Sequence, residues 1–179
     1  MKPLLAILLA LFTSFISYTQ NNHLVTSNGK WNNNSTWALG HTPRNGETAI
    51  VPKDFTVIVD NNMTVSSDIT IKVYGNLKFD VGKLKLSTNS VVLLYPGGTI
   101  TSEQGNASDK IEIGGLSKYS GSQGTLDGPL MANAATTSFD FFPVSLPVRF
   151  IDYSISGFQN VILIKWTTAE EENVLNYLI

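Results

Sequence analysis

The chain contains no cysteine and carries almost no net charge, and both absences restrict what it can be. Over 179 residues the formal charge is -2, so there is neither a basic surface for nucleic acid nor an acidic tail. Without cysteine, a secreted protein is held together by packing and backbone pairing alone, which suits a repetitive sheet better than a small disulfide scaffold. Because the net charge is close to zero, we expect no nucleic-acid partner.

Histidine is also scarce, since only His23 and His41 occur. Neither has a cysteine or a carboxylate at a spacing typical of metal ligands, and neither lies near a serine or aspartate arrangement typical of nucleophilic catalysis. The chain also lacks a nucleophile elbow and a phosphate-binding loop. The sequence therefore predicts no metal site and no cofactor at these positions.

Long hydrophobic runs are limited to the N-terminus, where Lys2 precedes the apolar run from Leu4 to Ile16. The run is short for a bilayer span and has no basic stop after it, so a signal peptide is favoured over a permanent anchor. We predict a signal peptide at residues 1–19 with cleavage near Thr19. The protein is then secreted or on the outer cell surface and meets a membrane only during export.

Residues 50–113 consist of short β-type runs that recur about every seven residues. The runs are TVIV, MTV, ITIKV, NLKF, KLKL, SVVLL, GTIT and IEI. Apolar and polar residues alternate within each run, and the apolar positions return about 20 residues later, as in coils stacked on one another. The sequence predicts an all-β protein whose main domain is a right-handed parallel β-helix, or β-solenoid, with coils over residues 47–116.

The repeat also predicts which side chains meet in columns inside the solenoid. We expect the columns Ile71–Val92–Ile111, Val73–Leu94–Ile113, Met63–Leu84, Val65–Leu86, Val57–Leu77, Val59–Phe79 and Phe79–Ile100. The polar alternates, lysines among them, should face the solvent and discourage pairing with other chains.

The flanking segments differ in composition from the repeat. Residues 20–46 are rich in turn-forming residues around Trp31 and Trp37, which predicts an N-terminal cap over the first coil; a sugar-stacking platform is the alternative. Residues 117–145 are rich in small residues and predict an irregular final coil and a linker. Residues 146–179 contain two alternating runs, VRFIDYSI and NVILIKW, and predict an incomplete β-sandwich segment.

Two kinds of residue at the corners between runs are candidates for function. Tyr74 and Tyr95 occupy matching corners and should stack about one strand spacing, about 4.8 Å, apart, which makes them the candidate ligand-binding pair. Asp60, Asp80 and Glu103 follow runs and form a candidate acidic ladder. Stacked carboxylates can bind Ca²⁺ or share a proton in polysaccharide cleavage, whereas solvated corner acids are the ordinary alternative.

The order of motifs from residue 28 to residue 115 resembles G8-like β-solenoid modules of large extracellular proteins, especially those of Bacteroidetes. The matching residues are Gly29, Trp31, Thr36-Trp37, Gly40, Pro43, Gly46, Ile50, the VIVDNN run at 57–62, the VYGNLKF run at 73–79 and PGG at 96–98. Relatives commonly have Gly-Asp before the first strand, where this chain has Gly46-Glu47. The resemblance implies a β-solenoid and transfers no catalytic residue.

Residues 146–179 resemble the opening of the fibronectin-III-like domain that often precedes the sorting domain of proteins exported by the type IX secretion system. The match lies in LPVRFIDYSISGFQNVILIKWTTAEEENVLNYLI. It implies a surface or released protein with adhesive or carbohydrate-related roles.

Three functional hypotheses follow from these observations. The first is a non-catalytic secreted module of a larger protein that binds glycans or extracellular matrix. The second is an accessory or catalytic part of a polysaccharide-active enzyme that uses the acidic ladder. The third is a spacer without a ligand. The sequence does not indicate the ligand or the oligomeric state.

Overall fold

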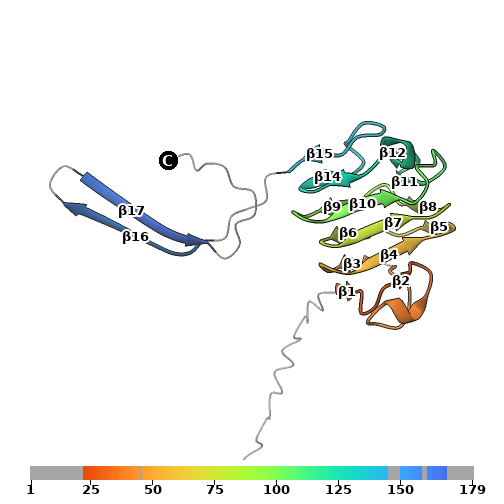
Figure 1. Cartoon of the computed structure of the whole chain (residues 1–179), viewed down its shortest axis with the longest axis horizontal. Helices are drawn as coiled ribbons and strands as arrows, with labels where there is room; N and C mark the ends of the chain where they lie inside the picture. Colours follow the sequence, from red (N-terminus) through yellow and green to blue (C-terminus); the bar gives the residue numbers. More distant parts are fainter. Residues whose placement is uncertain (1–21, 45, 145–149, 159–160, 169–179) are drawn as a thin grey trace, which may run out of the picture.

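The computed structural model describes residues 22–44, 46–144, 150–158 and 161–168, and in these ranges the protein is all-β (Figure 1). Three parallel sheets form the walls of a β-solenoid, and each coil of the chain adds one strand to each wall. The predicted fold class is confirmed. Two short 3₁₀ helices, η1 (Asn34–Thr36) and η2 (Gly121–Gln123), lie near the two ends of the stack.

The strands of each wall follow one another from the N-terminal end of the stack to the C-terminal end. The first wall contains β1 (Asn22–Leu24), β3 (Thr48–Val51), β6 (Thr70–Val73), β9 (Val91–Leu94), β14 (Leu130–Ala132) and β15 (Phe142–Pro143). The second contains β2 (Gly29–Lys30), β4 (Thr56–Val59), β7 (Asn76–Phe79), β10 (Thr99–Ser102) and β13 (Leu126–Asp127). The third contains β5 (Asn62–Val65), β8 (Lys83–Leu86), β11 (Lys110–Ile113) and β12 (Leu116–Ser120).

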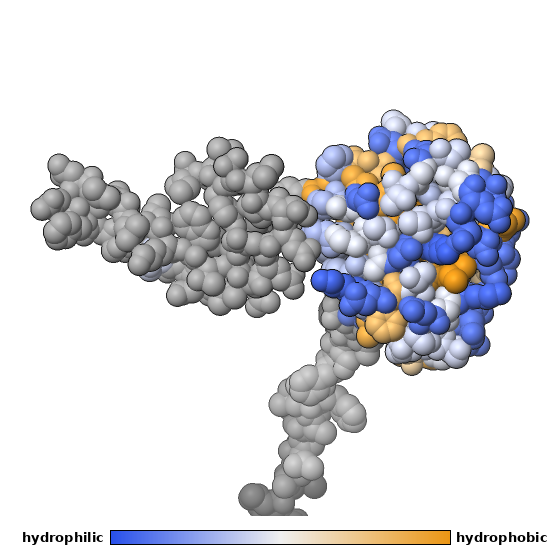
Figure 2. Space-filling view, in the orientation of Figure 1, coloured by the Kyte–Doolittle hydropathy of each residue, from blue (hydrophilic) through white to orange (hydrophobic). Residues whose placement is uncertain are grey.

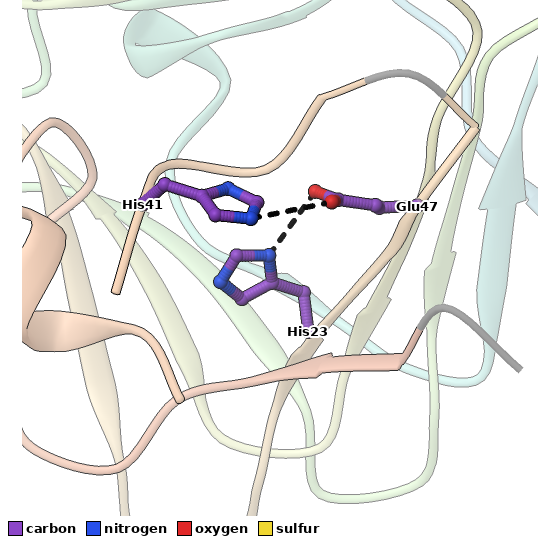
Figure 3. A group of neighbouring side chains, drawn as sticks. All are labelled: His23, His41 and Glu47. Carbon is purple, nitrogen blue, oxygen red and sulfur yellow. Dashed lines mark hydrogen bonds and ion pairs between the residues drawn. The ribbon is translucent and has the colours of Figure 1, made fainter. Parts of the chain in front are cut away.

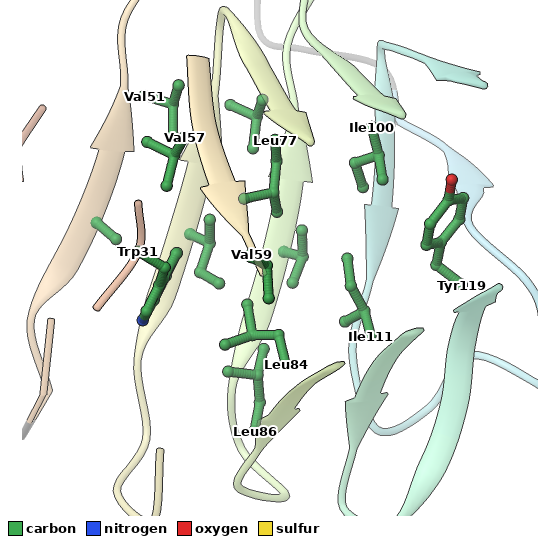
Figure 4. Close-up of a cluster of buried hydrophobic side chains, with 14 of the residues drawn as sticks. Trp31, Val51, Val57, Val59, Leu77, Leu84, Leu86, Ile100, Ile111 and Tyr119 are labelled. Carbon is green, nitrogen blue, oxygen red and sulfur yellow. The ribbon is translucent and has the colours of Figure 1, made fainter. Parts of the chain in front are cut away.

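Alternation within the strands places one set of side chains inside the solenoid and the other set outside. Val57, Val59, Leu77, Phe79 and Ile100 are fully buried, and Figure 4 shows members of this set meeting in the interior. The polar alternates are half-buried or exposed, and the face seen in Figure 2 mixes hydrophilic and hydrophobic residues. Each fully buried aliphatic side chain contributes about 1.5 to 3 kcal/mol before chain entropy is subtracted.

The observed register confirms four of the seven predicted columns and corrects three. Strands β6 and β9 pair Ile71 with Val92, and β5 and β8 pair Met63 with Leu84, as expected. However, Ile100 lies beside Leu77 rather than beside Phe79. A slip of two residues leaves every side chain on the same face, so alternation alone cannot detect it.

The other two corrections concern the third coil. Ile111 and Ile113 continue the column of Leu84 and Leu86 on the third wall rather than the column of Val92 and Leu94. The long connection between β10 and β11, residues 103–109, lengthens this coil beyond the others. A fixed period therefore assigns β11 to the wrong wall.

Glycine has two roles at the corner between the first and second walls. The sequence predicts positive φ angles for the corner glycines at 75, 97–98 and 114–115; Gly97 has one, with φ 79°, but Gly75 and Gly98 do not. A Cβ atom would lie 2.3 Å from the carbonyl oxygens of Phe55 and Pro52 at Gly75, and 2.0 Å from that of Val73 at Gly98. Glycine is required there because the backbones of successive coils approach closely. Gly114 and Gly115, expected at the same corner, instead form the turn between β11 and β12.

Both ends of the stack are closed. At the N-terminal end, Trp31 and Trp37 are 1% and 2% exposed, their rings lie edge to face with centroids 5.1 Å apart, and the Trp37 indole N–H donates to the Trp31 carbonyl at 2.8 Å. This burial supports the cap and contradicts the sugar-stacking platform.

At the C-terminal end, the strands β12, β13 and β14 run antiparallel to β11, β10 and β9. In the segment for which the sequence predicts an irregular final coil and a linker, residues 117–145, the chain reverses direction and adds a paired strand to each of the three walls.

The C-terminal part described by the structure is a hairpin of β16 (Phe150–Phe158) and β17 (Val161–Thr168). Both predicted strands are present, and the first includes Gly157 and Phe158, which the sequence assigns to the connection. The sandwich assignment for residues 146–179 stays a prediction. The predicted signal peptide, residues 1–19, lies outside the described residues.

Truncation of one interior side chain tests the assigned facing. We expect Leu84→Ala to lower the free energy of unfolding by about 2 to 5 kcal/mol, because Leu84 is fully buried between two coils. The adjacent Lys85→Ala should change it by less than about 0.5 kcal/mol. Urea unfolding of both variants measures the difference, and equal losses would contradict the facing.

Alkaline pH tests the burial of Tyr119 in β12. Burial raises the pKa of its phenol from 10.0 to about 12, and the hydroxyl donates to the Gly124 carbonyl at 3.0 Å. The unfolded chain ionises first, so the stability from the neutral phenol is complete below about pH 10 and is lost as the pH rises towards about 12. We expect the stability advantage over Tyr119→Phe, measured by urea unfolding, to shrink between about pH 10 and about pH 12. A constant difference would argue against a buried neutral phenol.

Candidate functional site

One corner of the solenoid, between the first and second walls, carries a row of half-buried rings. We call this row the corner stripe, and its members are Pro52, Phe55, Tyr74, Tyr95, Pro96 and Pro129. Backbone hydrogen bonds connect its levels, from the Tyr74 N–H to the Val51 carbonyl and from the Tyr95 N–H to the Val73 carbonyl, at 2.8 and 2.9 Å. The stripe therefore follows from the stacking of the coils.

The two tyrosines of the corner stripe stack as predicted. Their ring centroids lie 4.1 Å apart and the ring planes differ by 21°. The strand register continues the row with Pro52 on one side of the pair and Pro129 on the other. The pair therefore forms part of an outer ridge, and its role in ligand binding stays a prediction.

The three candidate acids lie at the next corner, between the second and third walls, and they are in register. The Asp80 N–H donates to the Val59 carbonyl at 3.0 Å, and the Glu103 N–H donates to the Phe79 carbonyl at 2.8 Å. Asp60, Asp80 and Glu103 thus occupy successive levels. Thr101 lies opposite Lys78, two residues before Asp80, and is not part of this row.

Lysines neutralise two of these acids. Lys30 Nζ lies 2.5 Å from Asp60 Oδ2, and Lys78 forms an ion pair with Glu103. The hydrogen bond and the charge of Asp60 hold the pKa of Lys30 above its ordinary value. Surface pairs of this kind contribute little stability, but they reduce the negative charge that a Ca²⁺ ion requires.

A third group of polar side chains lies beneath the first coil and consists of His23, His41 and Glu47 (Figure 3). His23 Nδ1 lies 3.1 Å from Glu47 Oε2, and His41 Nε2 lies 3.6 Å from Glu47 Oε1. The His23 side chain is fully buried, whereas Glu47 is 12% and His41 27% exposed. The group, which we call the His–Glu cluster, is open to solvent on the His41 side.

The environment of Glu47 favours its ionised form. Burial by itself would raise the pKa of this carboxyl group, but the Arg44 N–H donates to Oε2 at 2.8 Å and the two histidines add further stabilisation. The balance places the pKa of Glu47 below its ordinary value.

Sequence reasoning missed the His–Glu cluster. The sequence shows no carboxylate at a spacing from either histidine that is typical of metal ligands, but in the structure both histidines face Glu47. The reason is that β1 pairs in parallel with β3, with Asn22 opposite Thr48, so that His23 meets a residue 24 positions later in the chain. Recognition of NHL as the first strand of the wall was the signal that could have revealed it.

Among the described residues, no helix has the length and the apolar character needed to cross a bilayer. No curated protein and no solved structure shows significant similarity to the chain.

Residues 33–123 match the G8 domain. The match covers the coils from η1 to η2, together with the corner stripe between Pro52 and Pro96 and the acidic ladder. G8 domains are typical of extracellular proteins, which is consistent with the predicted secretion. The stacked parallel walls and the family match agree, and the chain belongs to the G8 domain family.

Proposed function

We propose that the protein is a non-catalytic, extracellular binding module of a larger bacterial protein, and that the corner stripe recognises a glycan or another matrix polymer. The stacked pair Tyr74–Tyr95 carries this proposal. Rigid aromatic rings that are half exposed offer large apolar contact area at little entropic cost, and tyrosine adds a hydroxyl for hydrogen bonding.

The shape and the surroundings of the corner stripe favour a polymer as the ligand. The stripe follows an outer corner through several coils, so it suits an extended chain better than a small molecule, which needs an enclosed pocket. Exposed Lys53 and Asp54 lie between Pro52 and Phe55 and provide polar groups beside the rings. The rings offer apolar contact area and the neighbouring polar groups can hydrogen-bond to hydroxyl groups of a glycan.

The export route belongs to the same proposal. Residues 146–179 resemble the fibronectin-III-like domain that precedes sorting domains in type IX secretion, and the hairpin of β16 and β17 is compatible with the opening of such a domain. We propose a signal peptide at residues 1–19 and a Bacteroidetes protein located on the outer surface or released. The segments 20–46, 47–116 and 117–145 are proposed as its cap, coils and linker.

Substitution of the tyrosine pair tests recognition. A glycan array should identify a ligand, and titration with that glycan should show that Tyr95→Ala and Tyr74→Ala each weaken binding at least about tenfold, equivalent to about 1.4 kcal/mol. Tyr95→Phe should retain most of the affinity, because it keeps the ring. Lys85→Ala, on the third wall, is the matched control. Unchanged affinity in both alanine variants, with a native circular dichroism spectrum, would refute the assignment.

The register of Asp60, Asp80 and Glu103 supports polysaccharide cleavage as a second candidate function. We expect no release of reducing sugar and no heat from millimolar Ca²⁺, because lysines already pair with two of the acids. Turnover by the wild type that Asp80→Asn abolishes would establish the enzyme instead. If the glycan array is also blank, the spacer hypothesis remains.

A further inference from the structure

The His–Glu cluster unites three ligand-type side chains from separate parts of the N-terminal region. His23 lies on β1, His41 in the loop after η1, and Glu47 directly before β3. The candidate ligand atoms, one from each side chain, all lie within 4.8 Å of one another and point toward a common centre in Figure 3. The only two histidines of the chain are thus in one place.

The hydrogen bond of His41 determines how its ring can act. His41 Nδ1 lies 2.9 Å from the Thr42 carbonyl oxygen, which can only accept, so Nδ1 carries the proton. The Nε2 lone pair of the neutral ring then faces Glu47 Oε1 at 3.6 Å. A proton or a metal ion between these two acceptors would remove the repulsion between them. A histidine that donates one N–H to a backbone carbonyl and presents its other nitrogen is the usual form of a metal ligand.

The other two side chains are held in place by their own contacts. Glu47 Oε2 accepts from the Arg44 N–H at 2.8 Å, which fixes the carboxylate. The His23 ring lies edge to face with Trp37, at a centroid distance of 5.2 Å, and with His41, at 4.6 Å. When His23 binds through Nδ1, its proton lies on Nε2, which has no hydrogen-bond partner among the described residues. Placing the His23 proton on Nε2 therefore breaks no hydrogen bond that Nε2 makes in the described structure.

Two imidazole nitrogens and one carboxylate oxygen form a ligand set that suits Zn²⁺ and its neighbours in the first transition row. In a tetrahedral site with bonds of about 2.0 to 2.2 Å, neighbouring ligand atoms lie about 3.3 Å apart. His23 Nδ1 lies 3.1 Å from Glu47 Oε2 and His41 Nε2 lies 3.6 Å from Glu47 Oε1, so each nitrogen is near that distance from a different oxygen of the carboxylate. The partial exposure of His41 leaves an entry path and room for a water as fourth ligand.

We propose that His23, His41 and Glu47 bind one Zn²⁺ ion, which joins β1 and the tryptophan-containing loop to the first complete coil. The ion closes the loop between residues 23 and 47 and thereby stabilises the N-terminal end of the solenoid, where the stack has no further coil to cover it. The His–Glu cluster and the corner stripe share no residue.

Titration of the untagged full chain with Zn²⁺ tests the proposal, because a histidine tag would supply competing imidazoles. Calorimetry should show one equivalent bound, and Co²⁺ should produce the intense visible absorption of a tetrahedral site. His41→Ala and Glu47→Gln should each weaken Zn²⁺ binding at least about tenfold. Asp127→Asn, which replaces an exposed carboxylate outside the cluster, is the matched control and should bind as the wild type does.

A second measurement separates a metal site from an ion pair between His41 and Glu47. Zn²⁺ should raise the unfolding temperature of the wild type and of Asp127→Asn but not of His41→Ala. Because the His41 side chain is only half-buried, this variant is expected to fold. The histidine ring resonances of the wild type should shift on addition of Zn²⁺ and return with a chelator. The proposal is overturned if the wild type binds no Zn²⁺, or if His41→Ala binds it equally well. It is also overturned if His41→Ala loses the same stability with and without Zn²⁺, which would identify a purely structural ion pair.

Discussion

The contact between like-placed apolar side chains of successive coils is the interaction on which this protein depends. Each coil alone is too thin to bury its interior residues, and only the coil above and the coil below complete the burial of residues such as Leu77 and Leu84. Backbone hydrogen bonds between the levels satisfy the polar groups of the same strands. Packing between successive coils therefore determines both the stability and the shape of the protein, and the residues at the corners can differ from coil to coil.

The three corners of the solenoid have different chemistry because the coils repeat the wall residues but not the turns. One corner stacks rings, with glycine where the backbones touch. The next stacks acids that lysines neutralise. At the third, Asp68 accepts from Ser87 Oγ at 2.5 Å and from Asn89 Nδ2 at 3.1 Å, which lowers the pKa of the aspartate and ties neighbouring levels together.

The two ends of the stack have capping residues, because the terminal coils have no further coil to cover them. Two tryptophans and the His–Glu cluster lie at the N-terminal end, where β1 and β2 form only part of a coil. At the other end the chain reverses, and Lys118 in β12 is buried with its ammonium group hydrogen-bonded to the Thr136 carbonyl. Burial lowers the pKa of this lysine. Both ends thus combine a large buried side chain with a polar group held by a distant segment.

The sequence by itself determined the all-β class, the solenoid, the facing of the strands and the stacking of Tyr74 on Tyr95, because alternation and a period of about 20 residues are local patterns. Only the tertiary structure decided which strand pairs with which. A slip of two residues preserves the facing, so the sequence placed Ile100 beside Phe79, and the longer third coil moved Ile111 to another wall. The meeting of His23, His41 and Glu47 was decided in the same way, because the pairing of β1 with β3 joins residues that no local pattern connects.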